Sequence, residues 1–177
     1  MDVLSSELSL LASLLSTPDL DTKEAILELV AYYPWLQPAA QELEQLPVEV
    51  WQAEYKRLFT EHNVLSSFTN DMAYFNTKYY KLPLQNLKRM YKRMGLRLTD
   101  TSSDYLSILL ECVAYLNSNP THGKEFWDEL WHEHLAYWIP GFCQKLQRES
   151  RLIFYRVIAN RLYILLPKMQ RMAAAAA

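Results

Sequence analysis

Two histidines separated by one residue are the first side chains in this sequence that could hold a metal ion. His132 and His134 flank Glu133, and both residue types are common zinc ligands. On a helix, however, side chains two positions apart point about 200° away from each other, so the two imidazoles cannot bind the same ion. His134 falls in an apolar stripe, whereas His132 faces the other way. We therefore predict no metal site and interpret His134 as a core or lid histidine with a satisfied hydrogen bond.

The remaining candidates for catalysis are a cysteine and a pair of adjacent carboxylates. Cys143 follows His134 closely, but its neighbours in sequence do not resemble an activated thiol site. Asp128 and Glu129 adjoin in sequence, and adjacent side chains diverge on a helix. The GxSxG, P-loop and GxGxxG signatures of serine hydrolases and nucleotide-binding enzymes are absent from the sequence. We expect no catalytic residue, no enzymatic activity and no cofactor.

The termini and the cysteines predict a cytoplasmic protein. The chain begins with acidic and polar residues, and no secretory signal is visible. Its longest apolar runs, such as Tyr163 to Pro167, are far too short to span a bilayer, so no membrane insertion is expected. Cys112 and Cys143 have neither a metal-type nor a redox-type spacing, which fits a reducing compartment.

A run of cations between Lys78 and Arg97 is the strongest signal for a polyanionic partner. It contains seven basic side chains and no acid, and Tyr79, Tyr80 and Tyr91 lie among them. Nucleic-acid binding favours such a combination. The isoelectric point is about 6.1, however, and no known nucleic-acid fold is signalled. We interpret the run as a solvated helix face and expect no nucleic-acid partner. The alternative function is that of a helical adaptor or regulator that binds nucleic acid through Lys88–Arg97.

The segment TSSDYLSILLECVAYL combines two chemically different faces. Its helical period places four aliphatic residues on the inward face: Leu106, Leu109, Leu110 and Val113. The opposite stripe carries Asp104, Ile108, Glu111 and Tyr115, with Tyr105 and Cys112 at its flank. Carboxylates beside aliphatic and aromatic surface can bind an amphipathic peptide that carries arginines. The alternative interpretation is that Asp104 only stabilises the N-terminus of this helix through the helix dipole and that the stripe binds no ligand.

The elements that must position these residues are helices. Apolar residues recur at helical spacing from the first segment onward, prolines interrupt the pattern, and only three glycines occur. We expect a second helix capped by Asp21 or Thr22, a helix closed by Gly95, and a last helix, from about Ser150 to Leu166, at the centre of a bundle. The predicted fold is all-α, a single domain over residues 1–172 with about eight to ten helices. The low-complexity tail, Ala173–Ala177, is excluded from the functional interpretation.

Residues 61–80 interrupt the helical pattern, and charge is unevenly distributed on either side of them. The segment lacks a sustained helical period and is rich in Asn, Ser, Thr and aromatic residues, which predicts a long surface loop of functional type. Residues 1–71 carry 3 basic and 12 acidic side chains, whereas residues 72–177 carry 15 basic and 8 acidic ones. This asymmetry indicates either polar partner surfaces or a dipolar molecule.

Five motifs over about residues 50–166 occur in the order found in one protein family. EYKRLF (Glu54–Phe59) is followed by a polar and aromatic segment ending in DMAY (Asp71–Tyr74), and then by LKRMYKRMGL (Leu87–Leu96). The helix DYLSILLECVAYL (Asp104–Leu116) comes next, and HLAYWIPGFC (His134–Cys143) is the most specific of the five. Phe154, Tyr155 and Leu162 fit the final helix. In this order the motifs resemble the TorD/DmsD/NarJ-type chaperones that mature molybdenum-containing redox enzymes.

The resemblance implies an all-helical chaperone in the cytoplasm. Such proteins bind the twin-arginine leader of a molybdopterin-dependent oxidoreductase of the DMSO/TMAO reductase type, or its apoenzyme core. They hold the precursor for cofactor insertion before export or assembly, and some form homodimers, including domain-swapped ones. The residues expected to bind the peptide are Phe68, Asp71, Tyr74, Asp104, Tyr105 and Glu111. The residues expected to serve the architecture are His134, Trp138 and Pro140.

Overall fold

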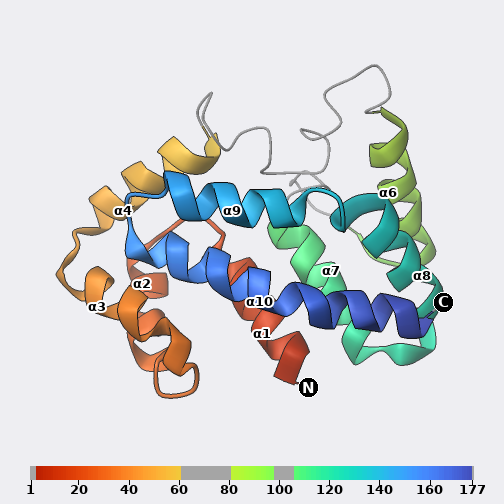
Figure 1. The fold of residues 1–177 in the computed structure, drawn as a ribbon, viewed down its shortest axis with the longest axis horizontal. Helices are drawn as coiled ribbons and strands as arrows, with labels where there is room; N and C mark the ends of the chain where they lie inside the picture. The colour runs from red at the N-terminus through yellow and green to blue at the C-terminus, as the bar shows by residue number, and fades with distance from the viewer. Residues whose placement is uncertain (1–2, 61–80, 98–105, 177) are drawn as a thin grey trace.

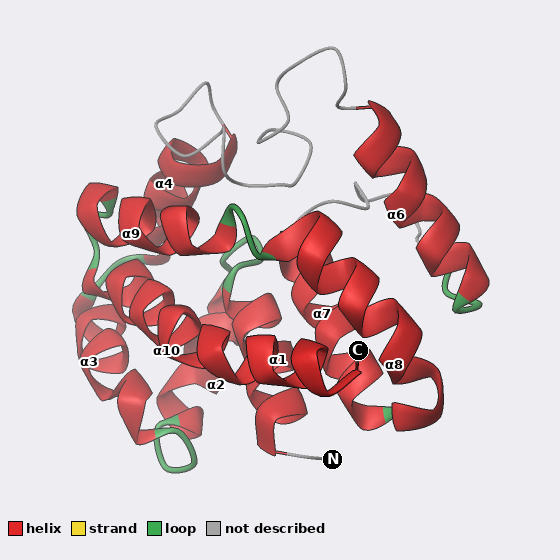
Figure 2. Ribbon diagram, turned by 45° about the vertical axis from the view of Figure 1, so that its right-hand side comes forward, coloured by secondary structure: helices red, strands yellow, loops and turns green. Residues whose placement is uncertain are grey.

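The computed structural model describes residues 3–60, 81–97 and 106–176, and in these ranges the chain is built of helices without a strand (Figures 1 and 2). The predicted all-α fold is therefore confirmed. The first half comprises α1 (Val3–Leu14), α2 (Leu20–Leu29), η1 (Pro34–Leu36), α3 (Gln37–Gln45), α4 (Val48–Tyr55) and η2 (Lys56–Thr60). The second half comprises α6 (Lys81–Arg93), α7 (Leu106–Ser118), α8 (Pro120–Glu129), η4 (Leu130–Leu135), α9 (Ile139–Glu149) and α10 (Ile153–Ala176).

Helix α10 occupies the middle of the bundle, as the sequence predicts. It packs against α1, α3, α8 and α9, and it crosses the centre of the molecule in Figure 1. Its N-terminus is fixed by Glu42 of α3, whose two carboxylate oxygens accept hydrogen bonds from the amides of Ile153 (2.9 Å) and Phe154 (2.8 Å). A carboxylate at this end of a helix satisfies free N–H groups and interacts favourably with the helix dipole.

One expectation about this last helix is wrong. It continues through Pro167 to Ala176 instead of ending near Leu166. It is also not buried on every side, because Ile153 and Ile164 are 41% and 49% exposed. A proline inside a helix removes one hydrogen bond, but the buried Met169 beyond it still packs into the core and holds the helical path.

Helices α1 and α7 form the pair behind α10. Leu8 and Leu11 of α1 are completely buried, and Ser5 beside them accepts a hydrogen bond from the Asn117 side chain of α7 at 2.7 Å. The four residues predicted for the inward face of α7 are all buried: Leu106, Leu109, Leu110 and Val113. The helical period alone therefore identified the core side of α7 correctly.

The ends of two helices show where local sequence signals are accurate. Helix α2 begins two or three residues earlier than expected, because Asp19 and not Asp21 or Thr22 is the N-cap and accepts a hydrogen bond from the Thr22 amide at 2.7 Å. Helix α6 ends at Arg93 and is closed by Gly95, as predicted, and the φ of Gly95 is 73°. The Leu96 amide donates to the Tyr91 carbonyl and the Gly95 amide to the Lys92 carbonyl, which is the Schellman arrangement.

Two turns of the chain adopt the wider π-helical geometry. One is η2, which ends at residue 60, and the other is η4, which continues α8. Such turns are uncommon and often occur near functional sites. Across residues 3–60, 81–97 and 106–176, none of the helices combines the length and apolarity needed to cross a bilayer.

Candidate functional site

Of the six residues predicted to bind a peptide, the structure describes one. Glu111 lies on α7, and its side chain is exposed. The other five lie outside the described residues: Phe68, Asp71, Tyr74, Asp104 and Tyr105. The candidate site is therefore built outward from Glu111.

Glu111 faces α1 and joins the two helices at the surface. Its Oε2 accepts a hydrogen bond from the Ser9 hydroxyl of α1 at 3.1 Å. Ile108 and Tyr115, predicted to share its stripe, are half-buried, whereas Cys112 at the flank is buried. Among the residues that the structure describes, this neutral hydroxyl is the one donor to Glu111, and a carboxylate can accept about four hydrogen bonds, so most of its capacity is left for a ligand.

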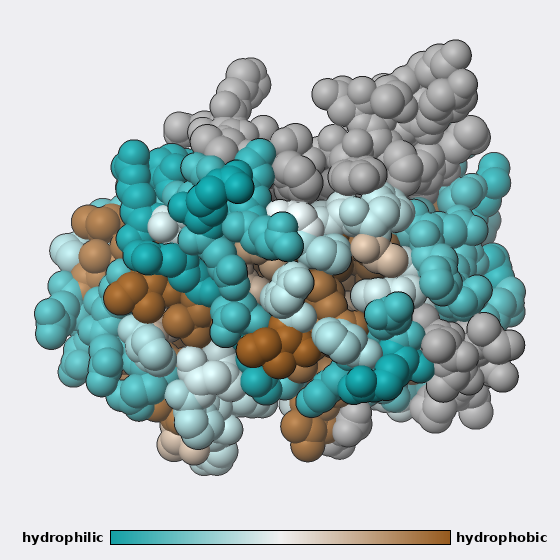
Figure 3. Space-filling view, viewed as in Figure 1, coloured by the Kyte–Doolittle hydropathy of each residue, from teal (hydrophilic) through white to brown (hydrophobic). Residues whose placement is uncertain are grey.

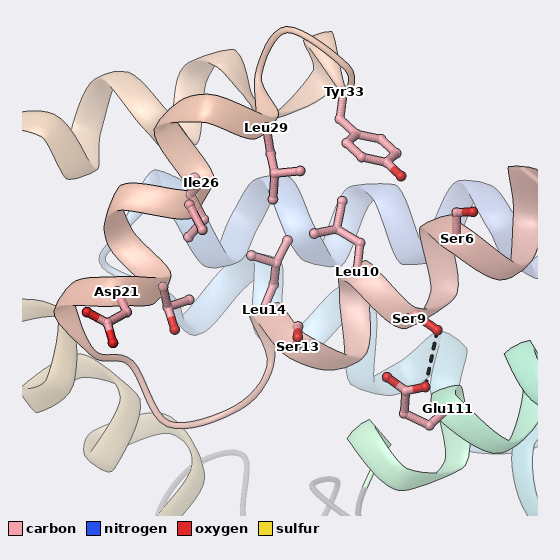
Figure 4. A pocket seen from close by; sticks show the side chains of 12 residues that line it. Ser6, Ser9, Leu10, Ser13, Leu14, Asp21, Ile26, Leu29, Tyr33 and Glu111 are labelled. Carbon is pink, nitrogen blue, oxygen red and sulfur yellow. Dashed lines mark hydrogen bonds between the residues drawn. The ribbon is translucent and has the colours of Figure 1, made fainter.

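A groove of about 640 Å³ begins at Glu111 and runs between α1 and α2 (Figure 4). Its floor is aliphatic, and its polar lining consists of hydroxyl groups and two carboxylates. The groove is lined by Ser6, Ser9, Leu10, Ser13, Leu14, Asp21, Thr22, Ala25, Ile26, Leu29, Tyr33 and Glu111. In the close view Asp21 and Glu111 stand at opposite ends of the groove, with Leu10, Leu14, Ile26 and Leu29 between them.

The groove exists because α2 is held to the body by few anchors. Ile26 is the one residue of α2 that is buried, and it packs beneath the groove. At the start of α2, Gln52 of α4 donates to the Pro18 carbonyl at 2.9 Å, and Lys23 donates to the Leu46 carbonyl at 2.8 Å. The other wall, α1, is firmly packed through Leu8 and Leu11. The groove therefore has one firmly packed wall, α1, and one wall with little buried surface, α2.

The groove can bind an apolar side chain and a cation at the same time. Aliphatic surface removed from water contributes roughly 25 cal/mol per Å², which favours a ligand with apolar residues. Asp21 and Glu111 favour Lys or Arg at the ends of such a ligand. The sequence pattern contained a signal for this surface: Ser6, Ser9, Ser13 and Ser16 recur with helical spacing beside the leucines of α1.

The motif Glu54–Phe59 forms a buried polar network away from the groove. Glu54 is 5% exposed and accepts two hydrogen bonds from Arg57, both at 2.7 Å, and one from the Arg151 amide at 2.7 Å. Arg57 also donates to the Glu149 carbonyl at 2.6 Å. Burial raises the pKa of Glu54, but the hydrogen bonds from Arg57 and Arg151 outweigh it and hold the pKa below its usual value. This network fastens η2 to the junction between α9 and α10.

The residues expected to serve the architecture lie at the join of η4 and α9. His134 is completely buried within η4, and its backbone carbonyl accepts a hydrogen bond from the Trp138 indole N–H. Trp138 is also completely buried, and Pro140 lies in the first turn of α9, where the missing N–H costs no hydrogen bond. The indole thus caps a carbonyl at the point where the chain turns into α9.

Neither cysteine is an activated thiol, and the described part of the chain contains no metal cluster. Cys112 and Cys143 are buried, and burial raises the pKa of each thiol to about 12, so neither is present as a thiolate at neutral pH. In residues 3–60, 81–97 and 106–176, no three His, Cys, Asp or Glu side chains come together as metal ligands. His132 is largely exposed, with its Nε2 3.5 Å from Asp128, while His134 is buried.

Of the cationic stretch between Lys78 and Arg97, one residue contacts a neighbouring helix and others are exposed to solvent. Arg93 of α6 forms ion pairs with Glu125 and Glu129 of α8, and its guanidinium lies 4.8 Å from the centre of the Phe126 ring. Lys88 and Lys92 are exposed on the outer side of the same helix. One cation of the run therefore anchors α6 to α8, and Lys88 and Lys92 are exposed, as expected for a solvated helix face.

Comparison with known proteins extends the description of the fold. The family model of the nitrate reductase delta subunit matches residues 16–144. Among the curated proteins, none matches the sequence. A crystal structure of an Archaeoglobus fulgidus protein assigned to redox enzyme maturation is similar, with a TM-score of 0.68 over 94% of this chain and 96% of that chain. At 20% sequence identity, this likeness establishes a shared fold.

Proposed function

Since this chain belongs to the nitrate reductase delta subunit family of NarJ/TorD-type redox enzyme maturation chaperones, we propose that it matures a molybdopterin-dependent oxidoreductase in the cytoplasm. In this proposal the chain binds the precursor of that enzyme through its twin-arginine leader, its apoenzyme core, or both. It holds the precursor until the cofactor has been inserted, before export or assembly. The chain itself performs no chemistry.

The groove between α1 and α2 is the observation that supports this proposal. A leader peptide presents arginines next to an apolar stretch, and the groove offers carboxylates next to aliphatic side chains. We propose that an arginine of the client takes the place of the Ser9 hydroxyl at Glu111. A guanidinium forms two parallel, charge-assisted hydrogen bonds with a carboxylate, and these are roughly twice as strong as neutral ones.

The apolar part of the client would enter between Leu14, Ile26 and Leu29. A peptide that buries two leucine-sized side chains there gains about 3–6 kcal/mol of hydrophobic free energy before the cost of ordering. Asp21 would attract a second cation at the far end of the groove. The sequence predicts that Asp104, like Glu111, pairs with arginines of the client, and that Phe68, Tyr74 and Tyr105 cover its apolar residues, with Asp71 as a further peptide-binding residue.

The proposal is tested by titrating the purified chain with a synthetic leader peptide and measuring fluorescence anisotropy. Glu111→Gln is expected to weaken binding by about 1–3 kcal/mol, because a charge-assisted contact is lost while the shape of the side chain is kept. Glu44→Gln on α3 removes an exposed carboxylate outside the groove, so affinity should stay unchanged. Equal losses in both variants would mean that only net charge matters, and no binding by the parent chain would exclude a leader as the ligand.

A further inference from the structure

The outer face of α10 is one continuous stripe that runs along the helix. At about 3.6 residues per turn, nine residues of α10 fall within an arc of about 140°. Eight of the nine are exposed and Val157 is half-buried, whereas the opposite side of the helix packs against α1, α3, α8 and α9. We call this set the α10 stripe, and it consists of Ile153, Arg156, Val157, Asn160, Tyr163, Ile164, Pro167, Lys168 and Arg171.

Apolar side chains form a line in the middle of the α10 stripe. Ile153, Val157 and Ile164 lie within about 40° of one another around the helix, and Tyr163 lies at the edge of the arc. Ile153, Tyr163 and Ile164 are 41%, 45% and 49% exposed. Figure 3 shows apolar patches between hydrophilic surface on the side of the molecule that α10 crosses. Apolar surface gathered in this way marks a site of contact with another surface.

The charge of the α10 stripe is entirely positive. Arg156 lies on one side of the apolar line, Lys168 on the other and Arg171 near the end of the helix, and the sequence of α10 contains no acidic residue. Among the residues that the structure describes, no carboxylate forms an ion pair with any of these three cations. Residues 139–172 contain seven basic side chains and one acidic side chain, so most of the positive charge of the second half of the chain lies in α9, α10 and the turn between them.

The position of α10 suits contact with a broad and flat partner. Figure 1 views the molecule down its shortest axis, and α10 runs across this broad side in front of α1. From Ile153 to Arg171 the α10 stripe is about 27 Å long. The groove at Glu111 lies elsewhere, because none of the residues that line it belongs to α10.

We propose that the α10 stripe binds to the surface of an anionic lipid membrane, with the helix axis parallel to the membrane plane. Helices that lie on membranes combine an apolar line with flanking cations, as α10 does. The isoleucines would enter the headgroup region, Tyr163 would lie at its polar edge, and the cations would contact lipid phosphates. The helix lies on the membrane and does not cross it, in agreement with its length and apolarity.

A lipid surface fits the α10 stripe better than a protein does. A stable protein interface buries roughly 800 Å² on each partner around an apolar core, and two half-exposed isoleucines and a tyrosine supply little of such a core. Arg156 and Lys168 are twelve residues apart, or about 18 Å along the helix. A fluid layer of phosphates can meet cations spread over this distance without a complementary shape.

This contact goes beyond the proposed chaperone function and does not rest on it. Its test is sedimentation of the whole chain with vesicles of phosphatidylglycerol and phosphatidylcholine, compared with vesicles of phosphatidylcholine alone. The parent chain should sediment with the anionic vesicles only, and higher salt should release it, because exposed charges are screened. Inorganic phosphate at the same ionic strength as a chloride control should not release it further, since the membrane surface and not a single phosphate is the ligand.

Paired charge reversals locate the binding surface. Lys168→Glu with Arg171→Glu should weaken binding to anionic vesicles roughly tenfold or more, since each cation near such a surface contributes to the attraction. Lys88→Glu with Lys92→Glu changes the net charge equally on α6, outside the α10 stripe, and should retain most of the binding. Circular dichroism shows whether each variant keeps its helices. Equal losses in the two folded variants would mean that only net charge matters and would overturn the proposal.

An apolar pair of variants completes the design. Ile164→Ser should weaken binding to the anionic vesicles several-fold, whereas Val50→Ser should not, because Val50 is similarly exposed (46%) but lies on α4. A parent chain that ignores anionic vesicles, or that binds both kinds of vesicle equally, would overturn the proposal. Leader-peptide binding is measured separately on the same variants, and it should be unchanged because the α10 stripe and the groove share no residue.

Discussion

Two glutamates, Glu54 and Glu111, show how the same side chain serves structure in one region and is available for binding in another. Glu54 is buried and accepts three hydrogen bonds from Arg57 and Arg151, so most of its acceptor capacity is used within the junction of α9 and α10. Glu111 is exposed and, within residues 3–60, 81–97 and 106–176, accepts one hydrogen bond, from a neutral hydroxyl. The carboxylate of Glu54 therefore holds the fold together, whereas Glu111 keeps acceptor capacity for the client that we propose it binds.

The two regions differ in backbone anchoring as well. The junction at Glu54 ties η2, α9 and α10 together through residues that are far apart in sequence. The groove at Glu111 has one wall, α2, with a single buried residue. Regions with little buried apolar surface open at low free energy, and binding sites are often drawn from them. The groove wall can therefore adjust to a client while the junction stays fixed.

The largest expected effect comes from breaking the junction. Glu54→Ala leaves Arg57 partly buried without its carboxylate, and we expect it to lower the free energy of unfolding by about 3–5 kcal/mol. Urea unfolding followed by circular dichroism measures this loss. Glu111→Ala is the matched control and should change stability by less than about 0.5 kcal/mol, since the residue is exposed. Similar losses in the two variants would remove the distinction between the two glutamates.

A smaller and more local effect is expected at the flexible wall of the groove. Ile26→Ala removes the single buried anchor of α2, at a cost of about 2–4 kcal/mol. Hydrogen exchange should then show faster exchange of the α2 amides, with the amides of α10 still protected. Leu27→Ala, on the exposed side of the same helix, should leave exchange nearly unchanged. Faster exchange throughout the molecule in Ile26→Ala would mean that α2 does not open independently.

Acid should weaken the junction at Glu54. Because the folded state lowers the pKa of Glu54 from its ordinary value of 4.5, the ionised carboxylate contributes stability above that value. This contribution is lost as the pH falls from 4.5 through the folded-state pKa. Unfolding measurements between neutral and acidic pH should therefore show a smaller loss of stability in Glu54→Gln than in the parent chain. Identical slopes would mean that Glu54 titrates alike in the folded and unfolded states.

The smallest expected effect concerns the hydrogen bond between the Ser9 hydroxyl of α1 and Glu111. Ser9→Ala removes the hydroxyl that contacts Glu111 at 3.1 Å and should change stability by less than about 0.5 kcal/mol. Affinity for the leader peptide should stay the same or rise slightly, since the arginine no longer displaces a hydroxyl. Anisotropy titration measures this, and a clear loss of affinity would show that Ser9 itself contacts the client.

The sequence predicts the helices better than the groove for a physical reason. Apolar spacing reports which side of one helix is buried, so the inward face of α7 and the glycine end of α6 could be identified from local residues. The groove depends on the distance between α1 and α2, which is fixed by tertiary contacts such as Lys23 with the Leu46 carbonyl. The role of Glu54 likewise depends on partners near residue 150, which no local pattern reveals.

The central claim is that this chain holds an unfinished redox enzyme through the groove at Glu111. Its most direct test is capture of bound proteins from anaerobically grown cells that express the chain, followed by mass spectrometry. The parent chain should recover the precursor of a molybdopterin oxidoreductase, and a variant combining Asp21→Asn with Glu111→Gln should recover much less of it. Recovery of nucleic acid or of unrelated regulators, with no such precursor, would contradict the account. Equal recovery by the parent and the variant would place the client elsewhere on the surface.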